Sequence, residues 1–162
     1  MSDEPAAPQF GRPEPGVAYR DRPAAFGIAE DDGRIAIVKV TAEGLRPWFD
    51  LPGGAIDPGE TAADAVVREF GEETGLIIEA GALFGRVDQR FRLADGEAVN
   101  NRCSLFHVRI TGLDAALKIE QDHELVWFKP ARALPLLRHD AHAWAVTAWL
   151  RRQPLDPPPP GD

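Results

Sequence analysis

The chain has 162 residues, which suits one domain that buries a core of its own without needing a disulfide or a metal for stability. Its 18 basic and 26 acidic residues give a net charge of −8, which argues against a general electrostatic surface for nucleic acid. It has a single cysteine, no apolar run near the roughly 20 residues that span a bilayer and no secretory pattern at its N-terminus, so we expect a cytoplasmic protein that does not bind membranes.

Proline marks both ends of the sequence. Residues 1–16 place prolines among small and polar residues, and residues 154–162 are dominated by a proline run. Such composition favours extended chain with little packing. We therefore predict a flexible N-terminal tail over 1–16, one folded domain over 17–153 and a proline-rich C-terminal tail over 154–162.

Between the tails, runs of apolar and β-branched residues predict strands. They lie at Ala24–Glu30, Arg34–Val40, Trp48–Leu51, Ile77–Phe91, Ser104–Ile110 and Leu125–Phe128. Apolar residues at helical spacing predict two helices, Ala62–Thr74 and Asp140–Arg152. Strands combined with two separate helices indicate an α/β (α+β) domain.

Three glutamates of the first predicted helix converge on one side of it. At about 100° per residue, Glu69, Glu72 and Glu73 fall within an arc of roughly 100°. They lie apart from the apolar stripe, which consists of Ala63, Val66, Val67 and Phe70. An acidic helix face is commonly no more than a solvated surface. However, like charges at this spacing destabilise a helix, and oxygen ligands at this density suit Mg²⁺ or Mn²⁺.

The segment Gly54–Leu76 resembles the signature of the Nudix hydrolase family. That signature is glycine, five residues, glutamate, seven residues, then Arg-Glu-apolar-any-Glu-Glu-any-Gly-apolar. Every defined place is filled, by Gly54, Glu60, Arg68, Glu69, Phe70, Glu72, Glu73, Gly75 and Leu76. The resemblance implies an α/β/α sandwich with a mixed sheet and a catalytic loop–helix–loop. It also implies a MutT-like nucleotide pyrophosphohydrolase, and the family is often homodimeric.

The resemblance assigns roles within this segment. The metal ligands would be Glu69, Glu72, Glu73 and the backbone carbonyl of Gly53, and Arg68 would pair with Glu72 or Glu60. The general base would be Glu69 or Glu73, as in many members of the family. In other members it is an acidic residue from a later loop.

In this chain, three acidic residues precede the strand at Leu125–Phe128 and qualify as that later base. They are Glu120, Asp122 and Glu124. We favour Glu124 among them. The alternative is that Glu124 is only an exposed acidic residue at the end of a strand.

The reaction that the resemblance implies is hydrolysis of the pyrophosphate linkage in a nucleoside diphosphate joined to another group. Family members that prefer ADP-ribose or diadenosine polyphosphates carry a proline or a tyrosine in the region that here reads Phe91-Arg-Leu93. We therefore favour a (d)NTP-type nucleotide. The alternatives are ADP-ribose, a dinucleotide polyphosphate or a nucleotide sugar, and a catalytically silent module that senses a nucleotide.

Four residues are candidates for substrate binding. Trp48 and Phe49 are placed to stack a base, although one of the two must face the core. Arg90 is a candidate for phosphate and Asn101 for a base edge. His139 and His142 lack a third metal ligand, and we expect them at the surface.

Overall fold

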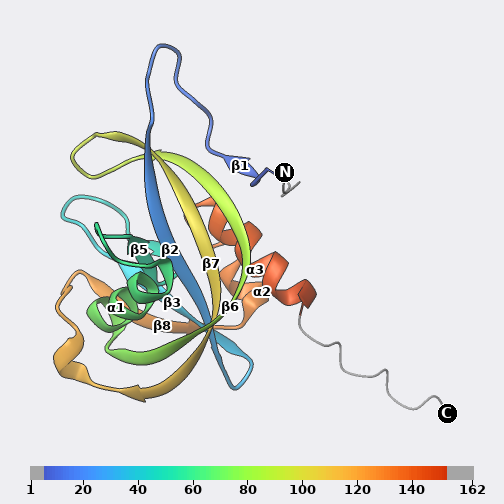
Figure 1. Ribbon diagram of the computed structural model, residues 1–162. Helices are drawn as coiled ribbons and strands as arrows, with labels where there is room; N and C mark the ends of the chain where they lie inside the picture. The colour runs from blue at the N-terminus through green and yellow to red at the C-terminus, as the bar shows by residue number, and fades with distance from the viewer. Residues whose placement is uncertain (1–5, 153–162) are drawn as a thin grey trace.

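The computed structural model describes residues 6–152, which form a mixed sheet between two helical layers (Figure 1). The strands are β1 (Gln9–Phe10), β2 (Arg20–Asp31), β3 (Arg34–Val40), β4 (Trp48–Asp50), β5 (Gly53–Ala55), β6 (Leu76–Arg92), β7 (Ala98–Leu113) and β8 (His123–Phe128). The helices are α1 (Ala62–Thr74), the 3-10 helix η1 (Ala115–Leu117), α2 (Pro130–Ala133) and α3 (Asp140–Arg152).

The sheet has the order β1-β6-β7-β2-β3-β4, with β5 paired to β2 and β8 paired to β3. The long strands β6 and β7 form an antiparallel hairpin, whereas β2 runs parallel to β7 and β1 runs parallel to β6. Strand β3 is antiparallel to both β4 and β8. The sheet is therefore mixed, as predicted.

Alternation along β2 and β3 gives the domain two cores. Ile35 and Ile37 pack with residues of α3, whereas Ala36 between them packs with residues of α1. Successive side chains of a strand point to opposite faces, so a strand with apolar residues on both faces must be covered on both sides. Helix α1 covers one face and α3 covers the other, which confirms the α/β/α arrangement.

The two predicted helices begin and end at the predicted residues. The prediction for Val67 is wrong, because its side chain is exposed and does not join the buried stripe of α1. Within residues 6–152, no helix is long and apolar enough to cross a membrane.

The predicted flexible tail over 1–16 needs correction within its described part. Gln9 and Phe10 pair with Asp88 and Gln89 of β6, and the Asp88 N–H donates to the Pro8 carbonyl at 2.8 Å. This segment satisfies backbone groups at the outer edge of the sheet, which composition alone does not predict. The proline-rich segment predicted over 154–162 lies outside the described residues.

Candidate active site

Two glycines before α1 are packed closely against neighbouring elements. Gly53 has φ of 145°, and a Cβ there would lie 2.2 Å from the Ala25 carbonyl oxygen. A Cβ on Gly54 would lie 2.8 Å from a carboxylate oxygen of Glu69. The position of Gly53 therefore requires glycine, which lets β5 lie against β2, whereas a side chain at Gly54 would displace the carboxylate of Glu69.

Arg68 connects the carboxylates of the motif. Its Nε and Nη2 atoms donate to the two oxygens of Glu60 at 2.8 and 2.9 Å. Its Nη1 atom donates to Glu69 at 3.0 Å and to Glu72 at 3.1 Å. Hydrogen bonding to Arg68 lowers the pKa of Glu60 to about 2. Both partners that the sequence offered for Arg68, Glu60 and Glu72, are thus bound at once.

Glu73 is the most deeply buried carboxylate of the motif, with 4% of its surface exposed. One of its oxygens accepts a hydrogen bond from the Gly53 N–H at 2.8 Å. The other lies 3.1 Å from Nε2 of His123. Burial raises the pKa of Glu73 to about 7, against the opposing effects of His123 and the Gly53 N–H. Burial likewise raises the pKa of Glu69, which places proton exchange at this helix closer to neutral pH than for free carboxyls.

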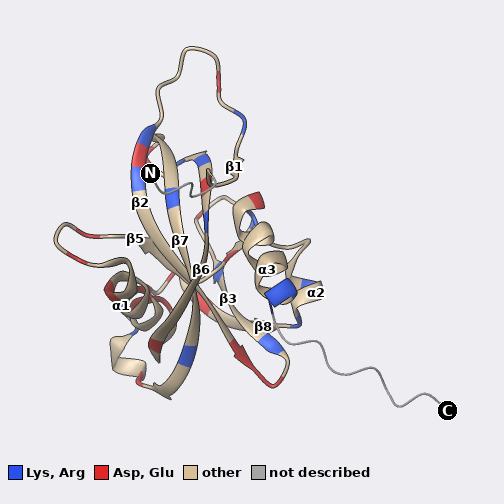
Figure 2. Ribbon diagram, turned by 45° about the vertical axis from the view of Figure 1, so that its right-hand side comes forward, with Lys and Arg blue, Asp and Glu red and all other residues tan. Residues whose placement is uncertain are grey.

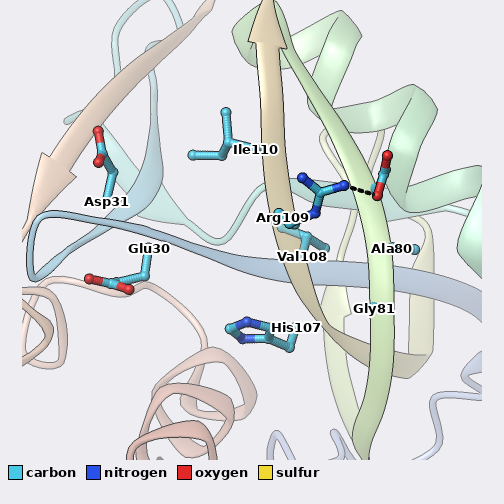
Figure 3. Close-up of a pocket in the computed structure, with 9 residues that line it drawn as sticks. Glu30, Asp31, Ala80, Gly81, His107, Val108, Arg109 and Ile110 are labelled. Atoms are coloured by element: carbon cyan, nitrogen blue, oxygen red, sulfur yellow. Dashed lines mark hydrogen bonds and ion pairs between the residues drawn. The ribbon is translucent and has the colours of Figure 1, made fainter.

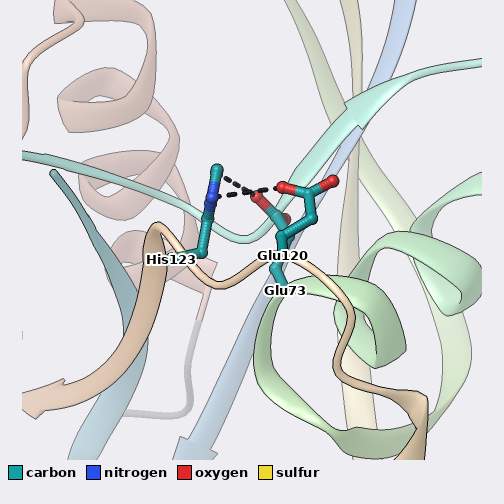
Figure 4. Close-up of side chains that lie close together, drawn as sticks. All are labelled: Glu73, Glu120 and His123. Carbon is teal, nitrogen blue, oxygen red and sulfur yellow. Dashed lines mark ion pairs between the residues drawn. The ribbon is translucent and has the colours of Figure 1, made fainter. Parts of the chain in front are cut away.

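The loop before β8 brings two further groups to the helix. Figure 4 shows His123 facing Glu73 and Glu120 together, with its Nδ1 atom 3.1 Å from Glu120. Burial disfavours the charged form of His123, but its contacts with Glu73 and Asp122 outweigh this and raise its pKa to about 9. His123 therefore lies between the carboxylates of Glu73, Glu120 and Asp122, a position that the sequence did not indicate.

Glu120 is the later acid that joins the cluster. Its carboxylate groups with Glu69 and Glu72, and also with Glu73 and His123, with ligand atoms within 4.8 Å of one another in each set. Glu124 is exposed and lies opposite Lys39 in the β3–β8 pairing. Because neighbouring residues of a strand alternate between faces, the strand that directs His123 toward Glu73 directs Glu124 away from it.

A cavity of about 170 Å³ adjoins this cluster. Glu73, His123, Gly53 and Gly54 line one part of it. The remaining walls include Arg22 and Asn101 from β2 and β7, and the group Asp50, Phe91, Arg138, His139 and His142. Figure 2 shows acidic residues on α1 and basic residues on β2 and β7. The cavity therefore joins carboxylates to a wall that carries arginines.

The candidate substrate residues are dispersed. Asn101 lines the cavity and accepts a hydrogen bond from Arg22 at 3.0 Å. Phe49 faces the core, with its ring centroid 5.6 Å from that of Phe128. Trp48 donates from Nε1 to Asp50 at 3.1 Å and lies outside the cavity lining. Arg90 also lies outside the lining and donates to the Gly11 carbonyl at 3.4 Å.

The expectation that His139 and His142 lie at the surface is wrong. They are 8% and 2% exposed and contribute to the cavity wall. His142 accepts a hydrogen bond from the Leu51 N–H through Nδ1 at 3.2 Å, so this atom carries no proton. Burial lowers the pKa of both imidazoles to about 3. The spacing of the two histidines in the sequence does not indicate that they are buried. Their burial comes from contacts with Phe26 and Phe91, which lie far away in the sequence.

A larger hollow of about 590 Å³ lies on another part of the surface (Figure 3). It is lined by Glu30, Asp31, His107 and neighbouring residues of β6 and β7, and it includes no residue of the glutamate motif. Arg109 within it is already paired with Glu79. The larger hollow therefore lies apart from the glutamate motif, whereas the smaller cavity adjoins it.

Comparison with known proteins agrees with this geometry. Residues 18–150 match the family model of the NUDIX domain. An ADP-ribose pyrophosphatase of Methanocaldococcus jannaschii is 34% identical over 128 residues, which cover 79% of this chain and 72% of that protein. A putative 8-oxo-dGTP diphosphatase of Bacillus subtilis is 42% identical over 90 residues, which cover 56% of this chain and 55% of that protein.

Among solved structures, a Nudix hydrolase from Nitrosomonas europaea shares the fold with a TM-score of 0.69 at 20% identity, covering 82% of this chain and 90% of that one. A MutT Nudix hydrolase from Burkholderia pseudomallei has a TM-score of 0.56 at 29% identity, covering 80% of this chain and 98% of that one. With the family model spanning most of the described residues, the chain belongs to the Nudix hydrolase family and is a hydrolase of phosphoric anhydride bonds.

Proposed function

We propose that this protein is a divalent-metal-dependent pyrophosphohydrolase that cleaves the pyrophosphate linkage of a nucleoside diphosphate joined to another group. We propose a (d)NTP-type nucleotide as its substrate. The observation that carries the proposal is the buried carboxylate of Glu73, which lines the same cavity as Arg22 and Asn101. A carboxylate of raised pKa beside cationic side chains suits proton transfer next to a bound phosphate.

The donor set fits a hard divalent cation. Glu69, Glu72 and Glu120 present carboxylate oxygens within 4.8 Å of one another, and Glu73 lies next to Glu120 in the second set. Oxygen donors of this kind suit Mg²⁺ or Mn²⁺. We propose that these glutamates hold the metal, with the Gly53 carbonyl as a further ligand. When bound, the metal would neutralise the polyphosphate and lower the pKa of a coordinated water.

We assign the general base and the residues that position it as follows. Glu73 has a pKa near neutrality and is our proposed general base, with Glu69 as the second motif candidate. His123 and the Gly53 N–H hold the two oxygens of Glu73 in place. Arg68 fixes Glu69 and Glu72 through one Nη atom. Among the later acids, Glu120 is better placed for the site than Glu124.

The size of the cavity supports a small substrate. At about 170 Å³ it is smaller than the roughly 300–1,000 Å³ common for small-molecule sites. A single nucleotide, with its phosphates beside Glu73 and the rest extending outward, suits such a volume better than a dinucleotide. The Bacillus subtilis relative named a putative 8-oxo-dGTP diphosphatase also supports a (d)NTP-type substrate.

ADP-ribose is the second candidate. The relative that matches over 128 residues is named ADP-ribose pyrophosphatase, and its identity of 34% extends over most of the domain. The two candidates differ in what lies beyond the second phosphate. A screen that includes both compounds therefore separates them.

The test is a hydrolysis screen of the purified protein with Mg²⁺ or Mn²⁺, in which chromatography detects the nucleoside monophosphate and the other phosphate-bearing product. The panel contains common and oxidised (d)NTPs, ADP-ribose, diadenosine polyphosphates and nucleotide sugars, each repeated with Glu73→Gln. We expect metal-dependent turnover of a (d)NTP and its loss by orders of magnitude in the variant. Turnover of wild-type rate in a folded Glu73→Gln protein would overturn the assignment of this site. No turnover with any compound would favour a nucleotide-sensing module.

A further inference from the structure

Arg22 occupies a position in the cavity wall that the sequence motif does not include. It lies in β2, where the parallel pairing with β7 sets it opposite Asn101. The side chain is partly buried and lines the cavity together with Gly53, Gly54 and Glu73. A cation from the sheet therefore lies at the site of the acidic helix.

Within residues 6–152, Arg22 has no carboxylate partner. Its hydrogen bond goes from Nη1 to the amide oxygen of Asn101 at 3.0 Å. Two nearby arginines are paired: Arg138 of the same wall with Asp50 at 2.9 Å, and Arg20, which lies on the same strand outside the cavity lining, with Glu97 at 2.6 Å. A guanidinium has five N–H donors, so the contact with Asn101 leaves most of the donors of Arg22 for another acceptor.

The electrostatic surroundings favour an anion at this place. Burial lowers the pKa of Arg22 from its usual value, and the charge of Arg20 adds to this effect. The negative charge of Glu69 in the acidic helix raises the pKa of Arg22, which is consistent with the position of Arg22 beside that helix. Guanidinium groups remain protonated even so, and a partly buried cation is stabilised by an anionic partner. Within residues 6–152, Arg22 donates its side-chain hydrogen bond to the neutral amide of Asn101, and Glu69 and Glu97 act on it through their charges without forming an ion pair with it.

We propose that Arg22 binds a phosphate group of the substrate, and that Asn101 positions its guanidinium for this contact. This inference rests on the proposed function, because the anion that Arg22 would bind is the diphosphate of the substrate. The glutamates would bind the same diphosphate through the metal. The planar fork of arginine matches two phosphate oxygens at once. Asn101 is then a positioning residue for Arg22, in place of the base-reading role that its sequence context suggested.

The experiment measures binding without turnover. Isothermal titration of the full chain, in Mg²⁺, uses methylenediphosphonate, a diphosphate analogue whose P–C–P bridge is not hydrolysed. We expect Arg22→Ala to weaken binding roughly 10- to 100-fold, since hydrogen bonds to charged groups are stronger than neutral ones. Arg22→Lys should restore part of the affinity, because it keeps the charge and loses the fork. Arg20→Ala is the matched control on the same strand and should bind within about twofold of wild type.

Asn101→Asp keeps the side-chain shape and gives Arg22 a carboxylate partner. If Arg22 serves the substrate, this pair occupies its donors and the affinity falls although the fold is retained. If Arg22 only supports the sheet, the new pair maintains thermal stability, and Arg22→Ala leaves the affinity at the wild-type value. Wild-type affinity in folded Arg22→Ala or Asn101→Asp would overturn the inference.

The two proposals fail in different ways. Loss of turnover in Glu73→Gln together with unchanged affinity in Arg22→Ala would contradict the role of Arg22. The proposed pyrophosphohydrolase activity would remain supported. Unchanged turnover in Glu73→Gln together with weakened binding in Arg22→Ala would leave a diphosphate-binding arginine beside a helix that is not the catalytic centre.

Discussion

Nε2 of His123 lies 3.1 Å from the carboxylate of Glu73, so the start of β8 and the end of α1 meet through one pair of side chains. The same imidazole also contacts Asp122 and Glu120 through Nδ1. Contacts of this kind fix the orientation of a functional carboxylate and compensate its charge. The pair supplies a hydrogen-bonding partner for a carboxylate oxygen that is buried away from water.

His123→Ala is predicted to lower kcat by about 10- to 100-fold, which is the usual cost of removing a residue that orients a metal-binding or catalytic group. The reason is that Glu73 loses the partner of one oxygen and keeps only the Gly53 N–H. Steady-state kinetics on the substrate from the screen, with circular dichroism to confirm folding, measure the effect. Unchanged kcat would show that Glu73 is held sufficiently by the backbone.

A second prediction compares the two later acids. Glu120→Gln should reduce both activity and apparent affinity for Mg²⁺, because Glu120 belongs to both sets of converging ligand atoms. Glu124→Gln should leave both quantities near wild type, because that side chain is exposed and faces away from Glu73. Titrating the initial rate with Mg²⁺ for the two variants gives the comparison. The reverse ranking would restore Glu124 as the later base.

The third prediction concerns stability and pH. The pKa of buried His142 is about 3 in the folded protein, against about 6.5 for a free histidine. The unfolded chain therefore takes up the proton first, so the contribution of His142 to stability is complete above about pH 6.5 and decreases as the pH falls. Between pH 7 and 5.5, this residue should account for a loss of about 1 kcal/mol in the free energy of unfolding.

The matched variant is His142→Asn, which keeps an acceptor for the Leu51 N–H without a group that titrates in this range. Urea unfolding of both proteins at pH 7 and 5.5 isolates the effect, because the contributions of Glu73 and His123 are common to both. We expect the variant to lose about 1 kcal/mol less than wild type over this interval. Parallel losses would mean that His142 takes up its proton without unfolding.

The elements that were predicted correctly depend on local patterns. Apolar spacing in α1 and α3 set their bounds, and apolar residues on both faces of β3 predicted a covered strand. The contacts that were missed depend on pairing between distant segments. Arg22 and Asn101 are 79 positions apart and meet through the parallel pairing of β2 with β7. The placing of His123 beside Glu73 likewise follows from the path of the loop into β8, which periodicity does not determine.

The short strand β1 has a consequence for how the protein behaves at high concentration. Strand β6 has 17 residues, and β1 is what lies beyond it in the sheet. Without β1, the backbone N–H and C=O groups of β6 that now pair with it would form an open edge, and open edges recruit strands from other molecules. β1 covers this edge at Asp88 and Gln89. We therefore expect removal of residues 6–10 to expose these backbone groups and to favour self-association, while leaving the glutamates of α1 in place.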